Sequence, residues 1–163
     1  MRPSPLALGA TLALTLAAGL STASQARGDA SACAALEASA EGVLGAAGAW
    51  AAGPVGYVGL ADAPGCTVTF AGTGETFGTS FQAVAGKLDA MLAGQGWTRD
   101  PNADADGATG TAAGYSKAGQ LLAVSVGYDT PRGVCREDAP AASCKPAPAQ
   151  MNYTITLGLR PAS

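Results

Sequence analysis

The sequence contains no histidine, and this absence removes several common catalytic arrangements. Ser-His and Cys-His sites need an imidazole as general base, and the usual zinc hydrolase sites bind the metal through histidine. A Ser-Lys pair survives formally, but Ser116 and Lys117 are neighbours in a predicted strand and therefore point to opposite faces. We therefore expect neither nucleophilic catalysis nor zinc-dependent hydrolysis.

Charged residues are also scarce. They make up 13% of the chain, with 9 basic against 12 acidic side chains and a net charge of −3. No cluster of lysine or arginine is present to contact phosphate groups. Nucleic acids and anionic membrane surfaces are thus not expected partners.

The chain has one long apolar run, and it is too short to span a bilayer comfortably. Leu6 to Leu20 is fifteen residues long, whereas a spanning helix needs about 20 apolar residues. Arg2 precedes the run, and small residues at Ser24 and Ala26 follow it. This order is typical of a secretory signal peptide cleaved after Ala26.

We accordingly predict a signal peptide over residues 1–26 and a single exported α+β domain over residues 27–163, secreted or periplasmic. A lipid-attached Cys33 is disfavoured because twelve residues separate it from Leu20.

Four cysteines remain in that predicted domain, which indicates two disulfides in an exported protein. They are Cys33, Cys66, Cys135 and Cys144. Four cysteines allow three pairings. Cys135 and Cys144 flank one loop between two predicted strands, so we pair them and assign Cys33 to Cys66.

The clearest periodicity predicts an amphipathic helix over residues 79–94, packed on one face of a sheet. Thr79 and Gln82 match a capping box at its start, and Gly94 and Gly96 suit its end. The residues of its apolar stripe follow spacings of three and four: Phe81, Val84, Leu88, Met91 and Leu92.

An alanine-rich helix is predicted earlier, over residues 30–47, with Asp29 or Ser31 as its cap. Its second half contains Gly42, Gly45 and Gly48, each costing about 1 kcal/mol relative to alanine, so we expect it to fray or break there. The following residues, 49–65, are predicted to be an apolar connector with at most one short strand.

Alternating apolar and polar residues predict the strands. They lie at residues 66–71, at residues 97–99, in a hairpin of residues 109–117 and 120–128 that turns at Ala118-Gly119, and at residues 152–159. The predicted fold is therefore α+β, with a mainly antiparallel sheet of about five strands.

Residues 100–107 are predicted to form an acidic loop. Asn102, Asp104 and Asp106 alternate before Gly107, which resembles the first half of an EF-hand calcium loop. The position of the bidentate glutamate falls on Ala113, and a solvated turn explains the same composition. Calcium, bound weakly, is the only cofactor that the sequence suggests.

Residues 72–78 are rich in glycine and lie between a predicted strand and a predicted helix, as a phosphate-binding loop would. The spacing is one residue too long and no lysine follows, so a flexible turn is the favoured interpretation.

Two further sets of residues allow both a structural and a functional interpretation. The aromatic residues are assigned to the core in preference to a ligand groove; they are Trp50, Tyr57, Trp97, Tyr115, Tyr128 and Tyr153. A hydrolytic carboxylate pair would have to come from residues such as Asp62, Glu75, Asp89 and Asp129.

We expect a non-catalytic binding or structural module for an unknown protein or small ligand. Its contact surface would be the exposed threonine and small-residue face of the sheet, or the loops around Gly72 and Asp100. The alternatives are a hydrolase that uses paired carboxylates on an extracellular polymer and a calcium-dependent structural or adhesion domain. The oligomeric state is not predicted.

Overall fold

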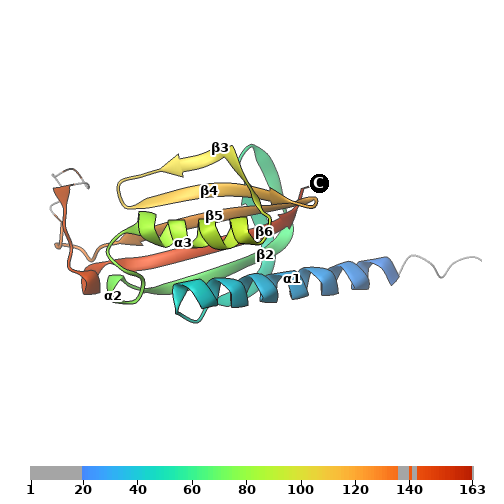
Figure 1. Cartoon of the computed structure of the whole chain (residues 1–163), viewed down its shortest axis with the longest axis horizontal. Coiled ribbons are helices and arrows are strands. Elements are labelled where there is room, and N and C mark those ends of the chain that lie inside the picture. The colour runs from blue at the N-terminus through green and yellow to red at the C-terminus, as the bar shows by residue number, and fades with distance from the viewer. Residues whose placement is uncertain (1–19, 136–139, 141–142, 163) are drawn as a thin grey trace, which may run out of the picture.

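The computed structural model describes residues 20–135, 140 and 143–162. These residues form one antiparallel sheet with helices on one of its faces (Figure 1). The elements are, in chain order, α1 (Leu20–Leu44), β1 (Ala49–Tyr57), β2 (Leu60–Thr73), α2 (Gly74–Phe77), α3 (Phe81–Gly94), β3 (Thr98–Asp106), β4 (Gly110–Lys117), β5 (Gln120–Asp129), the 3-10 helix η2 (Pro148–Gln150) and β6 (Asn152–Pro161).

The sheet has six strands in the order β1-β2-β6-β5-β4-β3, which confirms the predicted α+β fold. The sixth strand is β1: residues 49–65, predicted as a connector with at most one short strand, instead form β1, a turn and the first part of β2. β1 is built of small residues without an apolar alternation, so backbone pairing with one neighbour determines it and no side-chain pattern marks it.

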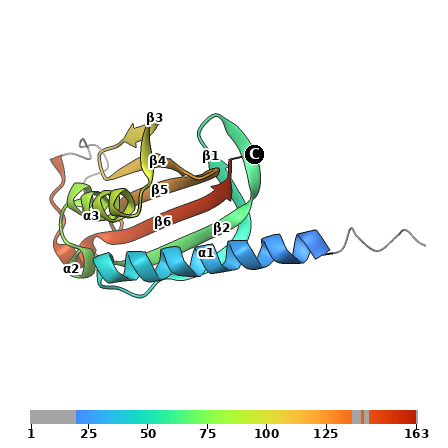
Figure 2. The ribbon, with the colours of Figure 1, turned by 45° about the vertical axis from the view of Figure 1, so that its right-hand side comes forward.

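The core lies between the sheet and the helices α1 and α3, which lie side by side over the same face (Figure 2). β2, β5 and β6 each contribute alternate residues to it, as the strand prediction required. The strand residues that are almost fully buried include Cys66, Val68, Phe70, Leu122, Val126, Ile155 and Leu157.

Helix α3 confirms the predicted apolar stripe, with Phe81, Val84, Leu88 and Leu92 buried. Its start differs by one residue. Ser80 is the N-cap, and its Oγ accepts a hydrogen bond from the Ala83 amide at 3.2 Å, so the predicted Thr79 capping box does not form. The left-handed Gly96, with φ of 83°, follows the end of the helix, as expected.

Helix α1 is longer than predicted at its start and shorter at its end. It begins at Leu20, so Asp29 and Ser31 lie inside it and do not cap it. It continues through Gly42 and ends at Leu44, before Gly45 with φ of 70°. Packing of Leu36, Ala40 and Leu44 on the core carries the helix past Gly42, and the break predicted for its second half occurs at Gly45.

The predicted cleavage point after Ala26 falls inside α1, whose first turns extend past the sheet in both views (Figures 1 and 2). Residues 1–19 of the predicted signal peptide lie outside the described residues. The described core begins further along, at Ala32 and Cys33.

Both predicted disulfides are confirmed. Cys33–Cys66 joins α1 to β2 within the core, and Cys135–Cys144 closes a loop between β5 and β6. Structural disulfides are typical of oxidising compartments. In the described part of the chain, no helix is long and apolar enough to cross a membrane.

Candidate binding groove and its polar clasp

Residues 55–61, which we call the hairpin tip, connect β1 to β2 and curl over the open face of the sheet, the face opposite the helices (Figure 2). Val55 packs directly on Gly158 of β6, because a Cβ atom at Gly158 would lie 2.8 Å from Val55 Cγ1. Gly59, with φ of 71°, makes the turn itself.

Arg160 of β6 anchors the root of the hairpin tip. Its side chain is buried, with 6% of the residue exposed. Nη1 donates to the carbonyl oxygens of Val55 at 3.3 Å and Ala61 at 2.6 Å, and Nε donates to that of Pro161 at 3.1 Å. Charged donors to backbone carbonyls make strong hydrogen bonds, so Arg160 ties both strands of the hairpin to β6.

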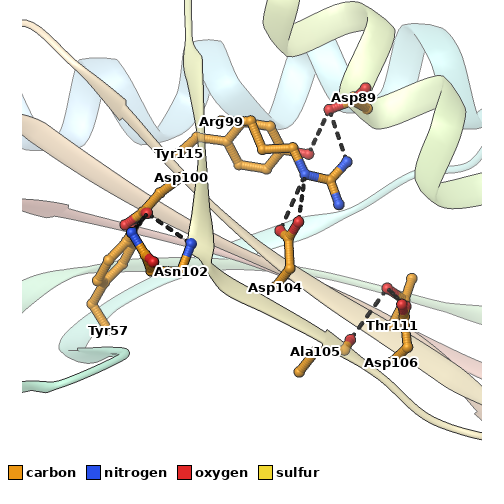
Figure 3. A network of polar contacts seen from close by, with 10 residues as sticks. All are labelled: Tyr57, Asp89, Arg99, Asp100, Asn102, Asp104, Ala105, Asp106, Thr111 and Tyr115. Atoms are coloured by element: carbon orange, nitrogen blue, oxygen red, sulfur yellow. Dashed lines mark hydrogen bonds and ion pairs between the residues drawn. The ribbon is translucent and has the colours of Figure 1, made fainter.

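The far end of the hairpin tip is held by one side-chain contact, which we call the clasp (Figure 3). Tyr57 Oη donates to Asp100 Oδ2 of β3 at 3.2 Å. Burial, and then the hydrogen bond to Asp100, raises the pKa of Tyr57 to about 12. The phenol is therefore protonated at physiological pH and donates its proton to the Asp100 carboxylate.

The clasp depends on a glycine beneath it. Tyr57 Oη and Ala103 Cβ both occupy the space that a Cβ atom of Gly114 would take. Gly114 is buried in β4, so any larger residue there displaces the tyrosine or Ala103.

Between the hairpin tip and the open face lies a groove of about 340 Å³, which we call the tip groove. Its floor is made of small residues because the strand register places Gly114, Ala123 and Gly158 in one row across three strands. The full lining is Pro54, Val55, Gly56, Tyr57, Val58, Thr67, Ala103, Ala112, Ala113, Gly114, Ala123, Val124, Ser125, Thr156 and Gly158.

An irregularity in β3 shapes one wall of the groove. Asp100 pairs with Gly114 and Ala105 with Ala112, so residues 101–104 of β3 stand against Ala113 alone. Such bulges re-aim side chains, and here the bulge brings Ala103 onto Gly114. The predicted loop of residues 100–107 is thus wrong in its class: it lies largely in an edge strand, whose single pairing neighbour leaves its polar side chains in solvent.

Beside the clasp, Arg99 links β3 to helix α3 (Figure 3). Arg99 Nε contacts Asp104 Oδ1 at 3.1 Å, and its Nη1 lies 3.5 Å from Asp89 Oδ1. Asp89 Oδ1 also accepts from the Tyr115 hydroxyl at 2.9 Å. The hydrogen bond to Asp104 raises the pKa of Arg99, and burial followed by the Asp89 bond raises that of Tyr115. A smaller cavity of about 200 Å³ lies between α3 and β4 at these residues.

The three calcium candidates lie on β3 and have different partners (Figure 3). Asn102 donates from its amide groups to Asp100, Asp104 binds Arg99, and Asp106 accepts from the Thr111 hydroxyl at 2.7 Å. Within the described ranges, no three acidic, cysteine or histidine side chains come close enough to hold a metal ion. The calcium hypothesis stays a prediction.

The glycine-rich segment 72–78 is more ordered than predicted. β2 continues to Thr73, and residues 74–77 form the short helix α2. Gly72 permits close packing, since a Cβ atom there would lie 2.7 Å from the Phe77 ring.

Most of the aromatic residues belong to the core, as predicted. Tyr153 contacts Phe77 and Tyr128, with ring centroids 5.7 and 5.5 Å apart. Tyr57 is the exception because it lines the groove. The signal that points to it is the turn glycine at Gly59 between apolar residues, which is typical of a hairpin.

Comparison with protein-family models, with curated proteins and with solved structures gives no match.

Proposed function

We propose that the protein is a small exported, non-catalytic binding module, and that the tip groove is its ligand site. The observation that carries the proposal is a groove of about 340 Å³ with one wall formed by an anchored hairpin tip. Ligand pockets commonly have volumes of about 300–1,000 Å³ and apolar linings with a few polar groups. The signal-peptide pattern and the two disulfides support export, secreted or periplasmic.

The lining indicates the chemistry of the ligand. It contains no charged side chain, and its polar side chains are the hydroxyls of Thr67, Ser125 and Thr156 together with Tyr57. An unpaired charge buried there would lack a counter-ion. The site therefore suits a neutral, largely apolar molecule with one or two hydrogen-bonding groups.

The same lining supports a non-catalytic role. Tyr57 is its single titratable group, and its raised pKa keeps it protonated at neutral pH. None of the three aliphatic hydroxyls, of Thr67, Ser125 and Thr156, has a general base beside it in the lining, so no activated nucleophile is formed there.

The hydrolase alternative has one specific observation to build on: Asp89 and Asp104 both approach the Arg99 guanidinium. Both carboxylates accept from this cation, and Asp89 also from Tyr115, whereas a glycosidase pair needs one acid able to donate and one base facing a substrate. The groove proposal is preferred because about 340 Å³ of the tip groove stays open beside the internal contacts of Val55, Tyr57 and Ala103.

The test uses small neutral probes and a pair of matched variants. Benzyl alcohol, cyclohexanol and octanol are titrated into the isotopically labelled protein, and amide chemical shifts are recorded. We expect saturable shifts at Ala112, Ala123 and Ser125. Ser125→Leu fills the groove and should abolish them, whereas Thr154→Leu, exposed on the same face outside the lining, should not.

The absence of shifts with all three probes, or equal shifts in the two variants, would refute the groove as a ligand site. Export is tested separately: mass spectrometry of protein recovered from outside the cytoplasm should find Arg27 as its first residue.

A further inference from the structure

The two edges of the sheet differ in their protection against pairing with another strand. Edge strands are usually protected by charges, proline or bulges. β3 has all three devices, with four charged residues, Pro101 and the irregularity after Asp100. The outer edge of β1 has Pro54 and no charge.

The edge of β1 is also accessible. Ala49, Ala51 and Ala52 are exposed, and β1 pairs only with β2. In the part of the chain that the structure describes, no backbone–backbone bond other than the β1–β2 ladder involves Ala49–Gly53. In an antiparallel pair each strand turns alternate backbone groups away from its neighbour, so β1 presents free donors and acceptors along this edge.

We propose that this edge pairs with β1 of a second copy of the chain, antiparallel and across a two-fold axis at Ala51. Pro54 has no N–H, which limits the ladder to Ala49–Gly53. In this register Ala49 lies opposite the partner's Gly53 and Trp50 opposite the partner's Ala52. The two sheets would become continuous, and the tip groove, on the face of each sheet, would remain open.

The side chains suit this register. Trp50 and Ala52 share one face of β1, since they pair with Val68 and Cys66, which both face the core. Trp50 is only partly buried in one copy. In the dimer the Trp50 indole would pack against the small side chain of the partner's Ala52, which leaves room for the ring. Aromatic residues commonly anchor interfaces.

The distribution of charge along the chain allows two copies to pair at this edge. Each chain has a net charge of −3, so two copies repel in most orientations. Residues 42–61 contain no charged residue, and this segment is centred between Ala51 and Ala52. Antiparallel self-pairing at Ala51 therefore places no charge opposite a like charge, which elsewhere would be destabilising.

The test measures the mass of the natively processed protein by sedimentation over a concentration series, with Ala51→Lys and Ala51→Glu variants. We expect a concentration-dependent dimer, and each variant alone should raise the dissociation constant about tenfold or more, because the two-fold axis places like charges together. An equimolar mixture of the two variants should restore dimers through opposite charges. Ala105→Lys, exposed on the β3 edge, is the matched control and should leave the dimer intact.

Hydrogen exchange of the wild-type protein gives a measurement that needs no variant. The outward amides within residues 49–53 should exchange more slowly at high protein concentration than at low concentration. A monomer at every concentration, a dimer insensitive to Ala51→Lys, or a mixture that fails to associate would each overturn the proposal.

Discussion

Gly114 supports the clasp from below, and its missing side chain makes room for Tyr57 and Ala103. We expect Gly114→Ala to break the Tyr57–Asp100 hydrogen bond and to lower the free energy of unfolding by about 1–3 kcal/mol, the usual range for overpacking. Urea unfolding measures the change. Gly86→Ala is the control, because a Cβ atom at Gly86 in α3 has nothing within 4 Å; it should be neutral or stabilising. Equal effects in the two variants would contradict this account of Gly114.

The clasp also leads us to predict how the pKa of Tyr57 responds to a change at Asp100. Loss of the negative charge in Asp100→Asn should lower the pKa of Tyr57 from about 12 toward its ordinary value of about 10, with burial retaining part of the shift. Phenolate absorbance against pH, with Tyr57→Phe subtracted, measures this pKa. An unchanged value in Asp100→Asn would show that the carboxylate has no part in the shift.

The same shift has a consequence for stability. The folded pKa of Tyr57 is above its unfolded value, so its contribution is complete below about pH 10 and is lost as the pH rises toward about 12. The unfolding free energy of the wild type should therefore fall more steeply over this interval than that of Tyr57→Phe. Parallel curves would disprove the linkage.

At the scale of elements, the apolar stripe of α3 and the alternation in β6 were predictable because each buries one face, and burial imposes a period on the residues. β1 and the true start of α1 were not predictable. A run of small residues with no apolar periodicity is compatible with a strand, a helix or a connector, and tertiary packing determines which of them forms. The tip groove was not predictable for the same reason, because its floor is made of residues with small side chains or none, which leave no periodic pattern in the sequence.

The first turns of helix α1 precede the residues that pack on the core, so we expect the chain to tolerate their removal. A chain that begins at residue 27 should have the same melting temperature as the full chain, because described core packing begins at Ala32 and Cys33. A chain that begins at residue 37 loses Cys33 and Leu36 and should melt at a lower temperature. Calorimetry measures both melting temperatures, and a large decrease for the chain that begins at residue 27 would contradict the prediction.

For the whole molecule, the two disulfides should differ in their contributions. Cys33 and Cys66 are 33 residues apart and buried, whereas Cys135 and Cys144 are 9 apart in a surface loop. On the chain-entropy estimate, the first contributes about 4 kcal/mol and the second about 3 kcal/mol. Replacing Cys33 and Cys66 by serine also buries two hydroxyls, so this double variant should lose clearly more unfolding free energy than the variant without Cys135 and Cys144. Denaturant unfolding of the two double variants measures the difference, and the reverse order would refute it.

The sequence by itself determined the α+β class, the two disulfides and the buried faces of α3, β2, β5 and β6, and the short loop between Cys135 and Cys144 favoured the pairing that the structure has. These follow from periodicity and from loop length, which are local properties. Only the tertiary structure decided that the first hairpin folds over the open face and that Asp100 meets Tyr57, 43 residues away. A groove between segments so distant in the chain depends on the register and curl of the whole sheet, and no local pattern of residues records that geometry.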